Sequence, residues 1–92
     1  MNVLLDADLV VNGERAKYYG DPLGNHGCIA AMMSAYLTRK YGVPVAFDAS
    51  DSAMFNILQK ISREAFRPKR DNLVDIAGYT AILERVSAAN QK

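Results

Sequence analysis

Asp71, Asp75 and Tyr79 are spaced four residues apart in the segment RDNLVDIAGYT, which spans residues 70–80. On a helix this spacing places the three side chains in one line along one face. Asp75 is the only charge between Asp71 and Glu84. A carboxylate on a helix whose other faces are apolar is costly to remove from water unless a cation, a metal or a hydrogen-bond donor meets it. The pattern predicts either a ligand site or an ion-pair network, and the sequence leaves both open.

Cations are concentrated just before this carboxylate line. Five of the eleven Lys and Arg side chains lie within positions 60–70, namely Lys60, Arg63, Arg67, Lys69 and Arg70. Like charges at this density repel one another unless anions accompany them, and arginine favours bidentate contact with phosphate. We therefore expect these side chains to grip a phosphate group. The alternative is an ordinary solvated helix face.

Asp71 and Asp75 are also candidate metal ligands. Carboxylate oxygens one helical turn apart could share a Mg²⁺ ion that bridges phosphate oxygens. The alternative is structural: Asp71 caps a helix, while Asp75 neutralises a cation such as Arg63 or Arg70. Because water and substrate oxygens commonly complete the shell of a Mg²⁺ ion, two carboxylates leave the choice open.

A second polar and aromatic cluster precedes the dipeptide Asp21-Pro22. It contains Arg15 and Tyr19, which could contact a nucleobase by stacking or could equally close a loop over the core. Tyr79 joins the candidate ligand set because it continues the line of Asp71 and Asp75.

The only histidine and the only cysteine carry no recognisable catalytic pattern. His26 has no cysteine or second histidine at ligand spacing, so we expect a packing or helix-surface residue rather than a zinc ligand or general base. Cys28 excludes an internal disulfide, and its place in a helical pattern predicts a small buried or half-buried thiol.

Composition bounds the class of protein. Ninety-two residues, half of them hydrophobic, predict a single domain over residues 1–92. The formal net charge of +1 argues against nonspecific DNA binding, and no sequence-specific DNA binding is expected. No apolar run approaches the ~18 residues of a membrane span. We expect a cytoplasmic protein that does not enter a membrane.

Cap and turn signals predict an all-α fold. The expected helices run over residues 3–11, from Asp21-Pro22 to about Tyr41, from a cap at Asp48 or Ser50 to Pro68, and from a cap at Asp71 or Asn72 to about Ala88. Residues 14–20 are expected to form a loop or a single turn, residues 43–47 an extended connector, and residues 89–92 a frayed end. Short connections favour a four-helix antiparallel bundle.

Helical spacing also predicts which faces are buried. The expected core stripe of the second helix is Ile29, Met32, Met33, Tyr36 and Leu37, and that of the third is Met54, Ile57, Leu58, Ile61 and Ala65. The fourth helix has an apolar surface wide enough to be buried on two sides. On so short a chain this surface suggests a second subunit, so we expect a homo-oligomer.

Two blocks of sequence resemble a family of small all-α proteins of phages and prophages whose function is unknown. They are Y-G-D-P, from Tyr19 to Pro22, and K-R-D-x-L-V-D-I-A-G-Y, from Lys69 to Tyr79. The resemblance covers roughly positions 9–84. The family is similar, at a distance, to MazG-like nucleoside-triphosphate pyrophosphatases and to nucleotide-modification-associated phage domains. The resemblance implies an oligomeric, MazG-like helical protein that handles nucleotides with Mg²⁺ in the cytoplasm of a bacterial host.

The metal motifs of the MazG-like enzymes are missing from this sequence. Neither Glu-x-x-Glu nor Glu-x-x-Asp is present, which favours binding over catalysis. We expect a phage-derived protein that holds a nucleotide or a nucleotide-derived signal through its Lys and Arg grip. Two alternatives are a Mg²⁺-dependent nucleotide pyrophosphohydrolase and a regulatory protein that docks on a host enzyme.

Overall fold

The computed structural model describes residues 2–12 and 21–90, and this part of the chain is helical and contains no strand. The helices are α1 (Val3–Asn12), α3 (Pro22–Tyr41), α4 (Ala49–Phe66) and α5 (Arg70–Asn90). Within these described residues, the prediction of an all-α fold with four helices is confirmed. The last helix differs at both ends from the prediction, because it begins at Arg70, before Asp71, and continues to Asn90.

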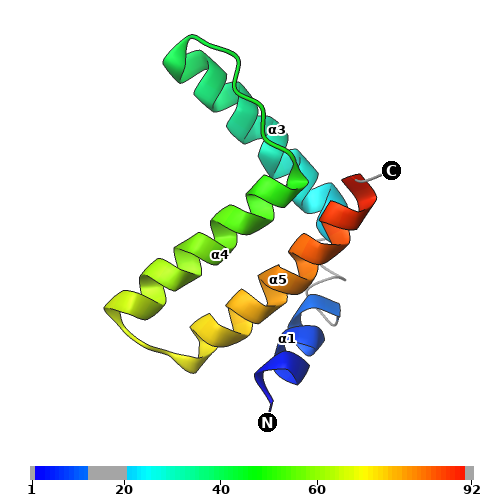
Figure 1. Ribbon diagram of the computed structural model, residues 1–92, viewed down its shortest axis with the longest axis vertical. Helices are drawn as coiled ribbons and strands as arrows, with labels where there is room; N and C mark the ends of the chain where they lie inside the picture. Colours follow the sequence, from blue (N-terminus) through cyan, green and yellow to red (C-terminus); the bar gives the residue numbers. More distant parts are fainter. Residues whose placement is uncertain (1, 13–20, 91–92) are drawn as a thin grey trace.

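The helices form a layer of three with a projecting fourth (Figure 1). α4 and α5 lie side by side and antiparallel, and α1 packs against α5 on the side away from α4. α3 contacts α4 and α5 near its own N-terminus and then extends away from them. The molecule is therefore elongated, with extents of 47 × 33 × 24 Å.

The core lies along α5, between α4 on one side and α1 on the other. Its buried residues are Val11, Ala49, Ala53, Ile82 and Val86, with Tyr79 and Leu83 packed against them. The last helix is indeed apolar on two sides, but α4 and α1 cover both sides within one chain. The surface from which a second subunit was expected is thus already occupied.

A glycine allows α1 to approach α5 closely. Gly78 is buried, and a Cβ atom at this position would lie 3.2 Å from Cγ2 of Val11. Such a contact is tighter than ordinary van der Waals packing. The absence of a side chain at Gly78 therefore sets how near Val11 and its helix can lie.

The predicted core stripe of α4 is wrong except at Ile57. Met54, Leu58, Ile61 and Ala65 are exposed, and the line that faces α5 is instead Ala49, Ala53, Ile57, Lys60 and Glu64. The small side chains of Ala49 and Ala53 let the two helices approach. Further along, Lys60 and Glu64 make polar contacts with residues on or beside α5. This orientation of α4 leaves its larger apolar side chains facing outward.

The predicted stripe of α3 is only partly covered. Ile29, Met33 and Leu37 are half-buried, whereas Met32 and Tyr36 are 61% and 64% exposed. Cys28 is exposed, which contradicts the expected buried thiol. The physical reason is that only His26 and Ala30, in the half of α3 nearest the other helices, are buried.

The connector after α3 folds back along that helix. Gly42 ends α3 in the left-handed conformation (φ 71°) and its N–H donates to the carbonyl of Thr38. The Thr38 hydroxyl accepts from the N–H of Val45 at 2.9 Å, and the Ser34 hydroxyl accepts from the N–H of Phe47 at 2.8 Å. Two hydroxyl groups one turn apart therefore accept the backbone hydrogen bonds that an extended segment would otherwise make to a neighbouring strand.

The predicted caps at Asp21 and Asp48 are confirmed, whereas Asp71 and Asn72, the predicted cap candidates of the last helix, lie inside α5. Asp21 precedes Pro22 and accepts a hydrogen bond from the N–H of Gly24 at 2.9 Å. Asp48 and Asp51 form a reciprocal capping box at the start of α4. Hydrogen bonds from the Ser50 hydroxyl and from the backbone N–H of Asp51 hold the pKa of Asp48 below its usual value.

We predict that Asp48→Ala lowers the free energy of unfolding by ~1 kcal/mol at neutral pH, the usual effect of losing such a cap. Because folding lowers the pKa of Asp48, its contribution is present above the ordinary value of 3.8 and is lost as the pH falls through the folded-state pKa. Urea titrations followed by circular dichroism should show this difference shrinking below that value. A difference that is constant down to the acid limit would contradict the assignment.

Candidate functional site

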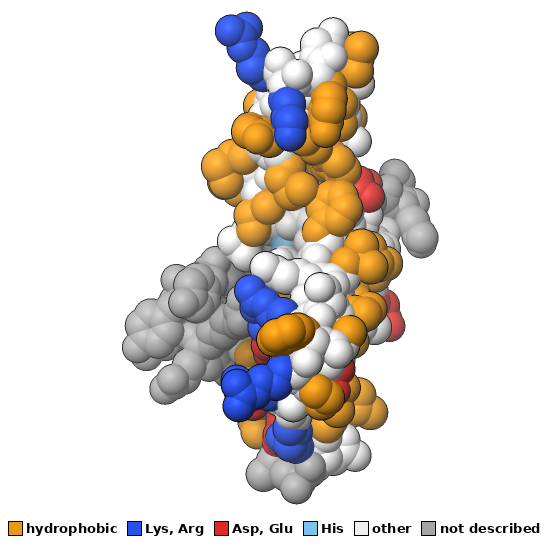
Figure 2. Space-filling view, turned by 90° about the vertical axis from the view of Figure 1, so that its left-hand side faces the viewer, with side chains coloured by type: hydrophobic (Ala, Val, Ile, Leu, Met, Phe, Trp, Pro, Cys, Tyr) orange, Lys and Arg blue, Asp and Glu red, His pale blue; other side chains and the backbone are white. Residues whose placement is uncertain are grey.

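An open cleft of about 520 Å³ lies where α4 ends and α5 begins. It is lined by Lys60, Ser62, Arg63, Phe66, Arg67, Lys69, Asp71, Asn72 and Asp75. The structure thus brings together four of the five predicted cations and both predicted carboxylates. Figure 2 shows Lys and Arg side chains gathered on the lower half of the molecule.

The local sequence fixes the turn that shapes the cleft. Arg67 adopts an extended backbone (φ −146°, ψ 100°), as expected for a residue before proline, and Pro68 ends α4. The carboxylate of Glu64 then accepts from the N–H of Lys69 at 2.9 Å and from the side-chain amide of Asn72 at 3.2 Å. One α4 side chain therefore satisfies donors on the connection and on the first turn of α5.

Asp75 pairs with Lys60, not with Arg63 or Arg70 as expected. The Lys60 Nζ and Asp75 Oδ2 atoms are 2.8 Å apart, and the two side chains are 17% and 27% exposed. Arg63 and Arg70 are both exposed. The pair joins the middle of α4 to the second turn of α5, so it supports the packing of these helices.

Arg70 has a separate role from the other cations. Its Nη2 atom lies 2.6 Å from Oδ2 of Asp6, on α1. This ion pair ties the start of α5 to α1 and takes the Arg70 side chain away from the cleft. Arg70 is therefore a structural cation, although the sequence grouped it with the phosphate grip.

Three cations in the cleft have no carboxylate partner within the described residues. The side chains of Arg63, Arg67 and Lys69 are exposed, and none lies within ion-pair distance of a described Asp or Glu. Since Lys60 and Asp75 neutralise each other, these three face only Asp71 among the remaining charged side chains that line the cleft. The cleft therefore carries a local positive charge, even though the whole chain is nearly neutral.

An aromatic ring lies among these cations. Phe66 is 91% exposed, the largest exposure of any large hydrophobic side chain in the described part of the chain. It occupies the last residue of α4, directly before Arg67. A ring in water beside cations is suited to stack on a flat aromatic ligand.

The carboxylates of the cleft differ in their surroundings. Asp75 is engaged with Lys60, whereas Asp71 is exposed in the first turn of α5. Over residues 2–12 and 21–90, no group of three or more His, Cys, Asp or Glu side chains could hold a metal ion. The Mg²⁺ hypothesis for Asp71 and Asp75 stays a prediction.

The remaining sequence-predicted residues lie elsewhere. Arg15 and Tyr19 fall outside the described residues. Tyr79 packs against the core and makes an edge-to-face contact with His26, so it does not line the cleft. His26 is 2% exposed and its Nδ1 atom lies 2.8 Å from the Ser52 hydroxyl, which makes it a packing residue between α3 and α4.

Sequence reasoning missed Phe66 and Glu64. The signal for Phe66 was its position directly before Arg67-Pro68, where α4 ends, so that its side chain lies at the turn into α5. The signal for Glu64 was a lone carboxylate among cations, four residues before Pro68. Both signals indicate a site only if the end of α4 is taken to lie at the surface of the protein.

Fold and cleft together define a small all-helical domain with an open, positively charged site between two antiparallel helices. Residues 2–87 match the family described as Domain of unknown function (DUF6378), and the chain belongs to this family. The expected relationship to small phage proteins of unknown function is confirmed. No solved structure matches the chain.

Two phage proteins show the relationship most concretely. The chain is 41% identical over 87 residues to the Gene 55 protein of Mycobacterium phage L5, and 35% identical over 86 residues to the Gene 55 protein of Mycobacterium phage D29. These matches cover 94% and 92% of this chain but 53% of each relative. The chain thus spans about half the length of the curated relatives it matches. Among its described helices, none has the length and apolar character needed to cross a membrane.

We predict that Asp75→Asn destabilises the fold by leaving the Lys60 ammonium beside a neutral amide. Breaking a fully buried pair costs ~3–5 kcal/mol and an exposed pair contributes under ~1, so ~1–2 kcal/mol is expected for this half-buried one. Urea denaturation measures the difference. Adding Lys60→Met removes the orphaned charge and should restore most of the stability. If Asp75→Asn is as stable as the wild type, the pair does not hold α4 to α5.

Proposed function

We propose that the cleft between α4 and α5 binds the phosphate groups of a nucleotide or a nucleotide-derived small molecule. The observation that carries the proposal is the group formed by Arg63, Arg67 and Lys69. These side chains lie at one open cleft and lack carboxylate partners in the described part of the chain, while neighbouring cations are paired.

Electrostatics supports an anionic ligand. Arg63 lies in the last turn of α4 and Arg67 is the C-cap residue of that helix, so two like charges that repel each other line the same cleft. A phosphate group placed between them would remove this repulsion and accept hydrogen bonds from both guanidinium groups. Lys69 approaches from the connection between the helices, so two segments of the chain could contact the same anion.

Size and chemistry favour a nucleotide over a bare inorganic anion. The cleft volume of about 520 Å³ falls in the usual range for small-molecule sites, about 300–1,000 Å³. Phe66 offers an exposed ring beside the cations, and stacking one base on an aromatic side chain contributes ~1–3 kcal/mol. The residue expected to stack on the base, Tyr19, lies outside the described residues, and we propose Phe66 for the base contact.

We propose binding without turnover as the activity of this site. A Mg²⁺ ion held by both Asp71 and Asp75 would compete with the Lys60 ammonium for Asp75. The fold would therefore lose part of its support when the metal bound. Hydrolysis by a MazG-like mechanism is the alternative that the same experiment addresses.

We predict that Arg63→Ala and Arg67→Ala each weaken the binding of a nucleoside triphosphate by more than about tenfold, because each removes a charge-assisted contact of ~1.5–3 kcal/mol. Calorimetric titration with the four ribonucleoside and four deoxyribonucleoside triphosphates measures this, and the salt dependence of the affinity should fall in both variants. Lys40→Ala, at the far end of α3, removes the same charge from another place and should leave the affinity unchanged.

The same titrations with Mg²⁺ or with EDTA separate the two activities. Affinity that does not depend on Mg²⁺, with the nucleotide recovered intact, agrees with binding alone. Release of pyrophosphate only when Mg²⁺ is present would identify a hydrolase. If neither arginine variant changes the affinity for any of the eight nucleotides, the cleft is not the binding site.

A further inference from the structure

Helix α3, whose distal half projects from the molecule, has no Asp, Glu, Lys or Arg side chain over seventeen consecutive residues. This uncharged stretch lies between Asp21 and Arg39. A helix face in contact with water normally carries charged side chains. Only His26 and Ala30 of this helix are buried, and Figure 2 shows hydrophobic side chains covering the upper half of the molecule.

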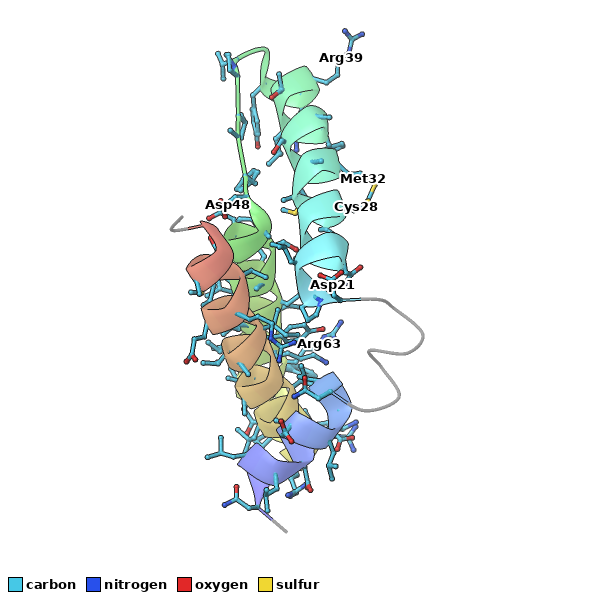
Figure 3. All side chains as sticks on the ribbon, turned by 90° about the vertical axis from the view of Figure 1, so that its right-hand side faces the viewer. Asp21, Cys28, Met32, Arg39, Asp48 and Arg63 are labelled. Carbon is cyan, nitrogen blue, oxygen red and sulfur yellow. The ribbon has the colours of Figure 1, made fainter. Side chains whose placement is uncertain are left out.

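Exposed residues of α3 form one straight row. They are Asp21, Asn25, Cys28, Met32, Ala35 and Arg39, with alternating spacings of four and three residues. Figure 3 shows Asp21, Cys28, Met32 and Arg39 along the side of α3 opposite the connector. These spacings average about 3.6 residues, the repeat of the α-helix, so the row follows one face along which another helix could pack.

We propose that α3 of a second copy of the chain packs antiparallel on this row and forms a homodimer. The charges at its two ends support this occupant. Asp21 and Arg39 are equally distant from residue 30, so a two-fold axis at that level places Asp21 of each copy opposite Arg39 of the other. Two Asp21–Arg39 ion pairs, one at each end, would then flank an uncharged centre in which Cys28 contacts Met32 of the second copy.

The surface area of the chain agrees with a missing partner. Its accessible surface is 6460 Å², whereas a folded monomer of 10.1 kDa exposes about 5,300 Å². Its radius of gyration of 14.2 Å also exceeds the ~12.3 Å of a compact chain of this length. The chain thus exposes more surface than a compact monomer of its mass, as expected where a helix projects from the other helices.

The outward face of α4 is the competing surface. Met54, Leu58 and Ile61 are exposed there. However, α4 packs along its length against α5 within one chain, whereas the distal half of α3 projects beyond both helices. The segment that most needs a partner is therefore α3, and matched substitutions on the two faces distinguish them.

Light scattering coupled to gel filtration tests the proposal on the whole chain. The expected mass at micromolar concentration is twice 10.1 kDa. Met32→Glu places carboxylates in the uncharged centre and should weaken the dimer at least about tenfold. Leu58→Glu makes the same change on α4 and should leave the dimer intact. A monomeric wild type, or a dimer lost in Leu58→Glu but kept in Met32→Glu, would overturn the proposal.

A disulfide test reports the register and does not depend on a disruptive charge. Met32→Cys places a thiol opposite Cys28 of the second copy, so oxidation should give a covalent dimer on non-reducing gels. In the wild type the two Cys28 residues are offset by four residues, about 6 Å along the helices, which exceeds the reach of a disulfide when added to the helix separation. Leu58→Cys is the matched control. Equal cross-linking of Leu58→Cys and Met32→Cys, or none in Met32→Cys, would refute the register.

Discussion

The hydrogen bonds of Glu64 are the interaction on which the candidate site depends. Its carboxylate receives the N–H of Lys69 and the amide of Asn72, and so fixes how α4 turns into α5. The negative charge lies at the N-terminus of α5, where the helix dipole favours it. These donors are neutral, and Glu64 makes no ion pair with Arg63, Arg67 or Lys69. One side chain therefore shapes the cleft without pairing with its cations.

The dense cluster of cations at positions 60–70 divides into two groups with different roles. Lys60 pairs with Asp75 and holds α4 to α5, and Arg70 pairs with Asp6 and holds α5 to α1. Arg63, Arg67 and Lys69 make no such pair within the described residues, and they line the cleft beside Phe66. The ion pairs that the sequence presented as an alternative to a ligand site are present, and the proposed ligand site shares their segment.

Helix boundaries could be predicted where a single residue dictates them. Asp21-Pro22 starts a helix, and Pro68 prevents α4 from continuing. The rotation of α4 could not be predicted, because counting large apolar residues favoured Met54, Leu58 and Ile61 over Ala49 and Ala53. The close approach of α5 and the Lys60–Asp75 pair decide the rotation, and both depend on residues distant in sequence. The cations of the site were found from their spacing. Phe66 was not, since its exposure follows from where α4 ends.

We propose that the end of α4 and the start of α5 form an anion-binding site beside the exposed ring of Phe66. Nuclear magnetic resonance titration of the labelled chain with a nucleoside triphosphate tests it most directly. We expect saturable shifts in the backbone amides of residues 63–72 and in the ring protons of Phe66, with little change at Cys28 or Met32. Inorganic triphosphate should shift the amides but move the ring much less. Saturable shifts confined to other parts of the chain, with the Phe66 ring unchanged, would contradict the account.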